Sequence, residues 1–190
     1  MGVLVVDDRP ESSREAMEEE LIANKKKLVQ QTWRAVELGL DVRATVAFYN
    51  RLFEKYPDTV AMFEGANMEL QAKKLYEVLQ VAVRCLDSLD ALVPVLEDLG
   101  ERHAIAYGVK REHYDAVTDV FIEVLNNYIS ANWEQSFQFH GLWKIQVAEA
   151  WAWVLTLVGK TMADAADKAI NAKASTDDSV DDTKPIEATS

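Results

Sequence analysis

The sequence has few of the residues that build disulfide frameworks, sharp turns and metal clusters. Among its 190 residues are one cysteine (Cys85), three histidines, four prolines and seven glycines. A single cysteine excludes an intramolecular disulfide, and a reducing cytoplasm suits it. The scarcity of proline and glycine, the residues that interrupt helices, favours a mostly helical chain. Because no apolar run approaches the roughly 18 residues that span a bilayer, we expect no membrane segment and a cytoplasmic location.

Basic residues are also scarce. The chain has 20 lysines and arginines against 32 aspartates and glutamates, a formal net charge of −12. Such a surface repels phosphate backbones and anionic lipid, so nucleic acids and membranes are disfavoured as partners. Acidic and hydroxyl side chains dominate residues 1–22 and 172–190, which have too little apolar surface to offset the entropy of ordering. We therefore expect a disordered acidic N-terminal extension (1–22), one domain (23–171) and a disordered C-terminal tail (172–190).

Apolar residues recur at helical spacing through the central segment. One stripe steps along a single helical face as Leu75, Val78, Leu79, Ala82 and Leu86, the pattern of an amphipathic helix. Equivalent stripes predict six main helices, around residues 28–40, 46–56, 68–86, 92–103, 112–131 and 137–169. No strand pattern of comparable strength occurs, so the predicted fold class is all-α.

The motifs of several enzyme classes are missing. The chain has no HExxH sequence, no glycine-rich phosphate loop and no nucleophile elbow, which argues against zinc, nucleotide and hydrolase sites. His113 follows Arg111 and Glu112 and is predicted to be an ordinary residue at a helix start. His140 is interpreted in the same way.

The surroundings of His103 differ from those of the other histidines. Leu96 and Leu99 lie seven and four residues upstream, on the same helical face, and Gly108 follows shortly after. An imidazole at the end of an apolar stripe can give an axial nitrogen to haem iron while water is kept away. From spacing alone, an ordinary surface or hydrogen-bonded histidine without a ligand remains the favoured interpretation.

Three segments together resemble successive helical segments of the globin family. They are RATVAFYNRLFEKYP, ELQAKKLYEVLQVAV and LEDLGERHAIAYGVKREHY. The resemblance implies an all-α globin fold, with helices A, B, C, E, F, G and H around haem b (iron protoporphyrin IX), and His103 as the iron ligand. The residues that it places against the cofactor are Phe63, Lys74, Leu75, Leu99, His103, Val109 and Tyr114. For Lys74, a propionate partner and an ordinary surface position are both consistent with the sequence.

Within that family the closer likeness is to bacterial and flavohaemoglobin-type chains. It depends on Tyr49 and Gln71, which match the two distal positions that face the gas ligand. A phenol and an amide both donate hydrogen bonds, so we expect slow oxygen release and a preference for oxygen over the less polar carbon monoxide. Without the family alignment, Tyr49 would be interpreted as a core aromatic and Gln71 as a solvated amide.

The same resemblance implies a proximal network in which a tyrosine and a glutamate tune the histidine. Tyr114 matches the tyrosine, but Glu149 is the only glutamate of the last helix, and Asp164 and Asp167 lie further on. That departure puts peroxidase-like chemistry in doubt. Because 190 residues leave no room for a flavin domain, a nitric oxide dioxygenase would need an external reductase.

The function expected is therefore reversible oxygen binding, for storage or transport, with carbon monoxide and nitric oxide as further ligands. The alternatives are nitric oxide detoxification with a separate reductase, a haem-based gas sensor, and a haem-free helical module of the same fold. We expect a monomer or a homodimer.

Overall fold

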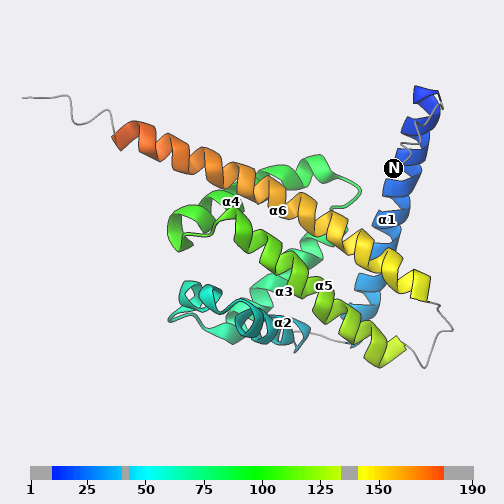
Figure 1. The fold of residues 1–190 in the computed structure, drawn as a ribbon, viewed down its shortest axis with the longest axis horizontal. Helices are drawn as coiled ribbons and strands as arrows, with labels where there is room; N and C mark the ends of the chain where they lie inside the picture. The colour runs from blue at the N-terminus through cyan, green and yellow to red at the C-terminus, as the bar shows by residue number, and fades with distance from the viewer. Residues whose placement is uncertain (1–9, 40–42, 134–140, 178–190) are drawn as a thin grey trace, which may run out of the picture.

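The computed structural model describes residues 10–39, 43–133 and 141–177, and their regular structure is entirely helical. Six α-helices and one 3₁₀ helix follow one another: α1 (Glu11–Gly39), α2 (Arg43–Lys55), η1 (Pro57–Phe63), α3 (Met68–Arg84), α4 (Leu89–Tyr107), α5 (Arg111–Trp133) and α6 (Gly141–Asp177). The predicted all-α class is confirmed. In Figure 1, α6 crosses the whole molecule with α5 beside it, and it contacts α1, α4 and α5.

Local capping sets several helix boundaries. The side chain of Asn67 accepts a hydrogen bond from the Leu70 amide at 3.0 Å, which caps the start of α3. Pro57 opens η1 after a single residue, Tyr56, that follows the end of α2, as expected for a residue that disfavours helical geometry in its predecessor. At the end of α4, Gly108 has a left-handed φ of 66° and its amide bonds to the Ala104 carbonyl, which confirms the predicted break.

Helix α1 begins within the segment that we expected to be an N-terminal extension. Its first turns, from Glu11 onward, are exposed, and Met17 and Leu21 keep about half of their surface accessible. Glutamate, alanine, methionine and leucine are strong helix formers, so these residues form helix without burying an apolar face. Helix α6 likewise continues to Asp177. The domain boundaries themselves stay predictions, and residues 1–9 and 178–190 lie outside the described parts.

Helix α6 provides the centre of the main core through Trp151, which is 1 % exposed. Its ring packs against Phe121 of α5 with centroids 5.0 Å apart. Its indole Nε1–H donates to the Thr32 hydroxyl of α1 at 2.8 Å, and that hydroxyl in turn donates to the Leu28 carbonyl at 2.7 Å. A buried hydrogen bond therefore joins α1 to α6 across the core.

None of the helices described is long and apolar enough to cross a membrane.

Replacing Thr32 with valine tests this connection. The Thr32→Val change keeps the shape of the side chain but leaves the Trp151 Nε1–H buried without its acceptor. We expect the free energy of unfolding to fall by about 1–3 kcal/mol, measured as a lower denaturation midpoint in urea. The control is Thr161→Val, which loses only a hydroxyl bond to the Leu157 carbonyl of its own helix. Equal losses in the two variants would contradict the prediction.

Candidate functional site

His103 lies on α4 with one ring nitrogen already occupied. Its Nδ1–H donates to the Leu99 carbonyl oxygen, one turn earlier, at 2.7 Å, since a backbone carbonyl can only accept. The lone pair of Nε2 is therefore the one left for a metal. Burial lowers the pKa of the His103 imidazole, and nearby Arg102 adds to this, whereas the bond to Leu99 opposes it. The result favours the neutral imidazole, which is the form that ligates metals.

Tyr49 of α2 and Gln71 of α3 meet as hydrogen-bonded neighbours. Tyr49 is 6 % exposed. Burial raises the pKa of its phenol, and the hydrogen bond with the Gln71 side chain opposes that rise. The phenol therefore keeps its proton at neutral pH and remains a hydrogen-bond donor. The two predicted distal residues are thus brought together, although they lie 22 positions apart in the sequence.

Phe63, from η1, packs edge-on against Tyr49 with ring centroids 5.3 Å apart. Phe53 of α2 lies at the same centroid distance from Phe63 and 6.0 Å from Tyr49. Leu75 packs against the same buried cluster, which includes Tyr49 and Ala72. Helices α2, η1 and α3 therefore gather three of the predicted site residues around one aromatic group.

One face of α3 leaves apolar side chains accessible beside these residues. Leu70 and Val78 are 50 % and 40 % exposed, and their spacing places them on the same helical face as Gln71, Lys74 and Leu75. Lys74 is exposed and the other two are half-buried. A surface with branched apolar side chains, an amide and a terminal cation suits a flat apolar cofactor that carries acidic groups, so the residues present fit a haem.

The remaining predicted residues gather around α4. Leu99 and Tyr114 both pack against a third core cluster, which includes Leu96 and Met162. Val109 is half-buried and its amide bonds to the His103 carbonyl at 3.1 Å, which places it directly after the end of α4. The roles of all these residues toward a cofactor stay predictions.

The proximal acid that the resemblance implied is not bonded to Tyr114 in the part of the chain that the structure describes. The Tyr114 hydroxyl is buried without a hydrogen-bond partner there, and burial, followed by the charge of Asp167, raises the pKa of this phenol. Glu149 is exposed. Arg111 instead holds Asp164 and Asp167 at 2.8 and 2.6 Å. The sequence analysis missed this clamp, although two aspartates at i and i+3 share a helical face and were a signal for it.

The other histidines agree with the sequence analysis as far as they are described. His113 accepts a hydrogen bond from the Lys110 amide through Nδ1 at 2.8 Å, which caps the start of α5. The prediction of a helix-start residue is confirmed. His140 lies outside the described residues.

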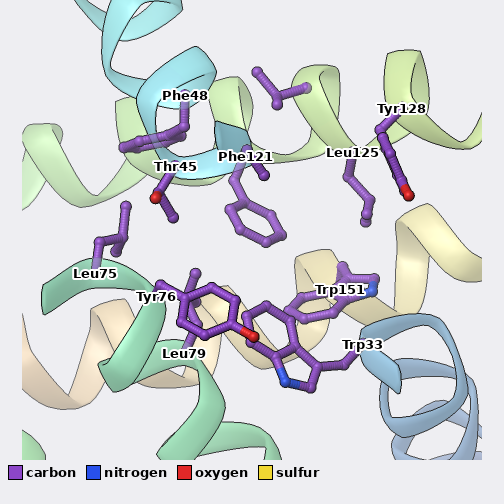
Figure 2. Close-up of a pocket in the computed structure, with 12 residues that line it drawn as sticks. Trp33, Thr45, Phe48, Leu75, Tyr76, Leu79, Phe121, Leu125, Tyr128 and Trp151 are labelled. Carbon is purple, nitrogen blue, oxygen red and sulfur yellow. The ribbon is translucent and has the colours of Figure 1, made fainter. Parts of the chain in front are cut away.

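A small apolar cavity occupies the core between α1, α2, α3, α5 and α6 (Figure 2). Its volume of about 40 Å³ is far below the several hundred Å³ of cofactor sites. Figure 2 shows Phe48, Leu75 and Trp151 among its walls, and neither Tyr49 nor His103 lines it. The cavity therefore adjoins the candidate site at Leu75 but does not include its histidine or its tyrosine.

A charged network fastens α2, the helix that carries Tyr49, to α5. Arg51 contacts Glu123 at 2.7 Å, and Lys55 contacts Asp119 and Glu123 at 2.8 and 3.1 Å. The Tyr56 hydroxyl donates to Asp119 at 2.6 Å. Two acidic side chains one turn apart on α5 thus hold two basic side chains one turn apart on α2.

The described residues form a helical fold in which Tyr49 lies beside Gln71 and His103 bonds to the Leu99 carbonyl, and comparison with known families identifies this fold. The globin family model matches residues 46–162, which is more than half of the chain. The chain belongs to the globin family.

Individual relatives are distant. The chain is 28 % identical over 97 residues to a flavohemoprotein of Bacillus thuringiensis subsp. konkukian, covering 50 % of this chain and 23 % of that protein. It is 29 % identical over 101 residues to an uncharacterized globin-like protein of Aquifex aeolicus, 50 % of this chain and 71 % of that one. It is 23 % identical over 164 residues to cytoglobin-1 of Oryzias latipes, 80 % and 84 %. The chain thus spans about a quarter of the length of the flavohemoproteins that it matches.

Among solved structures, an engineered carbene transferase from Rhodothermus marinus superposes with a TM-score of 0.57 at 21 % identity. The superposition covers 81 % of this chain and 96 % of the other. At this identity the likeness shows the shared fold.

The α2–α5 network predicts acid sensitivity. Lys55 and then Tyr56 hold the pKa of Asp119 below its ordinary value, and Arg51 and then Lys55 do the same for Glu123. Since a lowered folded-state pKa stabilises the fold only while the carboxylate is ionised, this contribution is present above the ordinary carboxyl pKa, near 4, and is lost as the pH falls below it. We expect the Asp119→Asn/Glu123→Gln variant to be less stable than wild type at pH 7 and at low salt. The difference shrinks below about pH 4, measured by thermal unfolding across pH.

The matched control is Glu77→Gln, whose exposed pair with Lys73 at 3.9 Å lies within α3 alone. It should change the melting temperature little at any pH. A difference between wild type and the double variant that grew on acidification would contradict the prediction.

Proposed function

We propose that this chain is a globin that binds haem b through Nε2 of His103 and reversibly binds oxygen, for storage or transport. The observation that carries the proposal is the 2.7 Å hydrogen bond from His103 Nδ1 to the Leu99 carbonyl, because it leaves a neutral Nε2 for a metal. Haem, when bound, supplies an iron that takes up a diatomic gas. Phe63, Lys74, Leu75, Leu99, Val109 and Tyr114 are proposed to hold it.

The distal pair supports slow release of oxygen. Tyr49 supplies a buried, protonated phenol, and the Gln71 side chain interacts with it. A hydrogen bond contributes about 0.5–1.5 kcal/mol net, and more with a charged partner, while about 1.4 kcal/mol is a factor of ten in affinity. Two such donors favour a polar gas such as oxygen over carbon monoxide.

The proximal side argues for reversible binding over peroxidase chemistry. Asp164 and Asp167 of α6 are both engaged by Arg111. The buried residues of this part of α6 are apolar and include Met162, Ala163 and Ala166. The acceptor of the His103 Nδ1–H bond is a neutral backbone carbonyl and not a carboxylate. A neutral acceptor donates less electron density through the imidazole than a carboxylate does.

A second candidate is nitric oxide dioxygenation with a separate reductase. The likeness to flavohemoproteins and the Tyr49–Gln71 pair favour it. Turnover of nitric oxide by the protein with an added flavin reductase would distinguish it from plain oxygen binding. For either function we propose a cytoplasmic monomer or homodimer.

Haem uptake by the purified protein tests the proposal directly. We expect titration with haemin to give a Soret band that saturates at one haem per chain, and a five-coordinate high-spin ferrous spectrum after reduction, because positions 71 to 75 contain no His, Met or Cys. His103→Ala should lose the band, whereas His113→Ala, at the start of α5, should keep it. A wild-type protein that stays colourless with haemin would end the proposal.

Removing the distal hydroxyl tests the role of Tyr49. We expect Tyr49→Phe to release oxygen about 10-fold faster and to change carbon monoxide release much less, both measured by stopped-flow spectroscopy. Tyr56→Phe is the matched control, since that hydroxyl bonds to Asp119 on the surface. Oxygen release at the wild-type rate in Tyr49→Phe would show that the phenol is not the donor.

A further inference from the structure

Helices α4 and α6 approach each other backbone to backbone at one residue. A Cβ atom built on Gly100 would lie 2.2 Å from the Met162 carbonyl oxygen, 2.7 Å from its Cα and 2.8 Å from its carbonyl carbon. Real Cβ atoms essentially never come within 3.0 Å of a heavy atom to which they are not linked through the chain. All three atoms belong to the α6 backbone, so no rearrangement of a side chain makes room. This helix packing requires glycine at position 100.

The glycine is not explained by the helix in which it lies. Gly100 is in the interior of α4, where glycine is less favourable than any other residue except proline. The backbone angle φ of Gly100 is not positive, in contrast to those of Gly65 and Gly108, so a left-handed conformation does not explain the glycine. The reason for glycine here is therefore the close approach of α6.

The contact lies next to the atom that orients the proximal histidine. The carbonyl of Leu99, which accepts the His103 Nδ1–H bond, belongs to the peptide group that joins Leu99 to Gly100. A peptide group is planar and rigid, so a constraint on the Gly100 Cα also constrains the Leu99 carbonyl. Leu99 itself packs against the cluster that contains Met162.

We propose that Gly100 is a positioning residue for the proximal ligand. By seating the Leu99–Gly100 peptide against the Met162 backbone, it sets the direction in which the His103 ring presents Nε2. The inference rests on the proposed function in one respect, since Nε2 needs a direction only if it binds a metal. Partners that orient a metal-binding histidine are worth roughly 10- to 100-fold in metal affinity.

A second glycine shows how this position differs from ordinary close packing. A Cβ on Gly159 would lie 3.2 Å from Cβ of Tyr114, which is a side-chain atom. Gly159 lies on α6, and among the described residues its peptide groups accept no hydrogen bond from a histidine ring. The nearest atom to a Cβ on Gly100 is an ångström closer than the nearest atom to a Cβ on Gly159, and it belongs to the backbone of α6. Gly100 is also the residue next to Leu99, whose carbonyl accepts the His103 bond.

The experiment compares Gly100→Ala with variants that weaken the same interface without touching this peptide. In Gly100→Ala, α4 must move away from α6 and take the Leu99 carbonyl with it. We expect a shifted iron–histidine stretching frequency in resonance Raman spectra of the haem-loaded ferrous protein, and haemin loss about 10- to 100-fold faster than in wild type. An unchanged frequency would overturn the proposal.

Two controls separate positioning from loss of packing. Leu92→Ala truncates a side chain of α4 that is 5 % exposed, in the same cluster but seven residues before Leu99. Met162→Ala truncates the side chain and keeps the backbone atoms that contact Gly100. Both should lower the melting temperature and keep the wild-type frequency. A shift in Met162→Ala would overturn the proposal even if Gly100→Ala failed to fold, whereas an unshifted frequency there would support backbone contact as the cause.

A measurement without haem keeps this inference distinct from the proposed function. In the apoprotein, the His103 Nδ1–H proton should exchange faster with solvent in Gly100→Ala than in wild type, and at the wild-type rate in Leu92→Ala, measured by NMR. If wild type binds no haemin, the proposed function fails, yet this exchange rate still tests whether Gly100 orients the ring. Equal exchange in wild type and Gly100→Ala would reject the positioning role.

Discussion

The hydrogen bond between His103 Nδ1 and the Leu99 carbonyl is the interaction on which the candidate site depends. It selects one tautomer of the imidazole, directs Nε2 away from its own helix, and does so with a neutral acceptor. The same carbonyl belongs to a peptide that lies against α6, where Gly100 allows direct contact with the Met162 backbone. Helix packing and ligand chemistry are thereby coupled through a single peptide group.

The two halves of the site are held by different physical means. On the distal side, a buried phenol and an amide are hydrogen-bonded to each other, and the helix that carries the phenol is fastened to α5 by solvent-accessible ion pairs. On the proximal side, packing dominates, and the nearby carboxylates of Asp164 and Asp167 are paired with Arg111. This division suits the proposed function, which calls for hydrogen-bond donors to a gas on one face and a neutral acceptor for the histidine on the other.

Much of the fold was predictable because apolar periodicity reports directly which helical faces are buried. The stripe of Leu75, Leu79 and Ala82 predicted α3, which ends at Arg84 and so two residues earlier than expected, and Gly108 predicted the end of α4. The early start of α1 was not predicted, because burial was used as the criterion and its first turns form helix while exposed. Among the site residues, His103 had only a weak signal of its own, and Tyr49 and Gln71 gained meaning from the alignment of whole segments with a family.

By itself, then, the sequence determined the helical class, the family, and the residue types available for a site. These follow from local apolar periodicity and from three segments that resemble successive helices of a known family in the same order. Only the tertiary structure decided which groups meet. The Tyr49–Gln71 bond, the Arg111 clamp and the contact of Gly100 with Met162 all join residues on different helices. Periodicity shows which side of a helix is buried, but the distance between two helices depends on how every side chain between them packs.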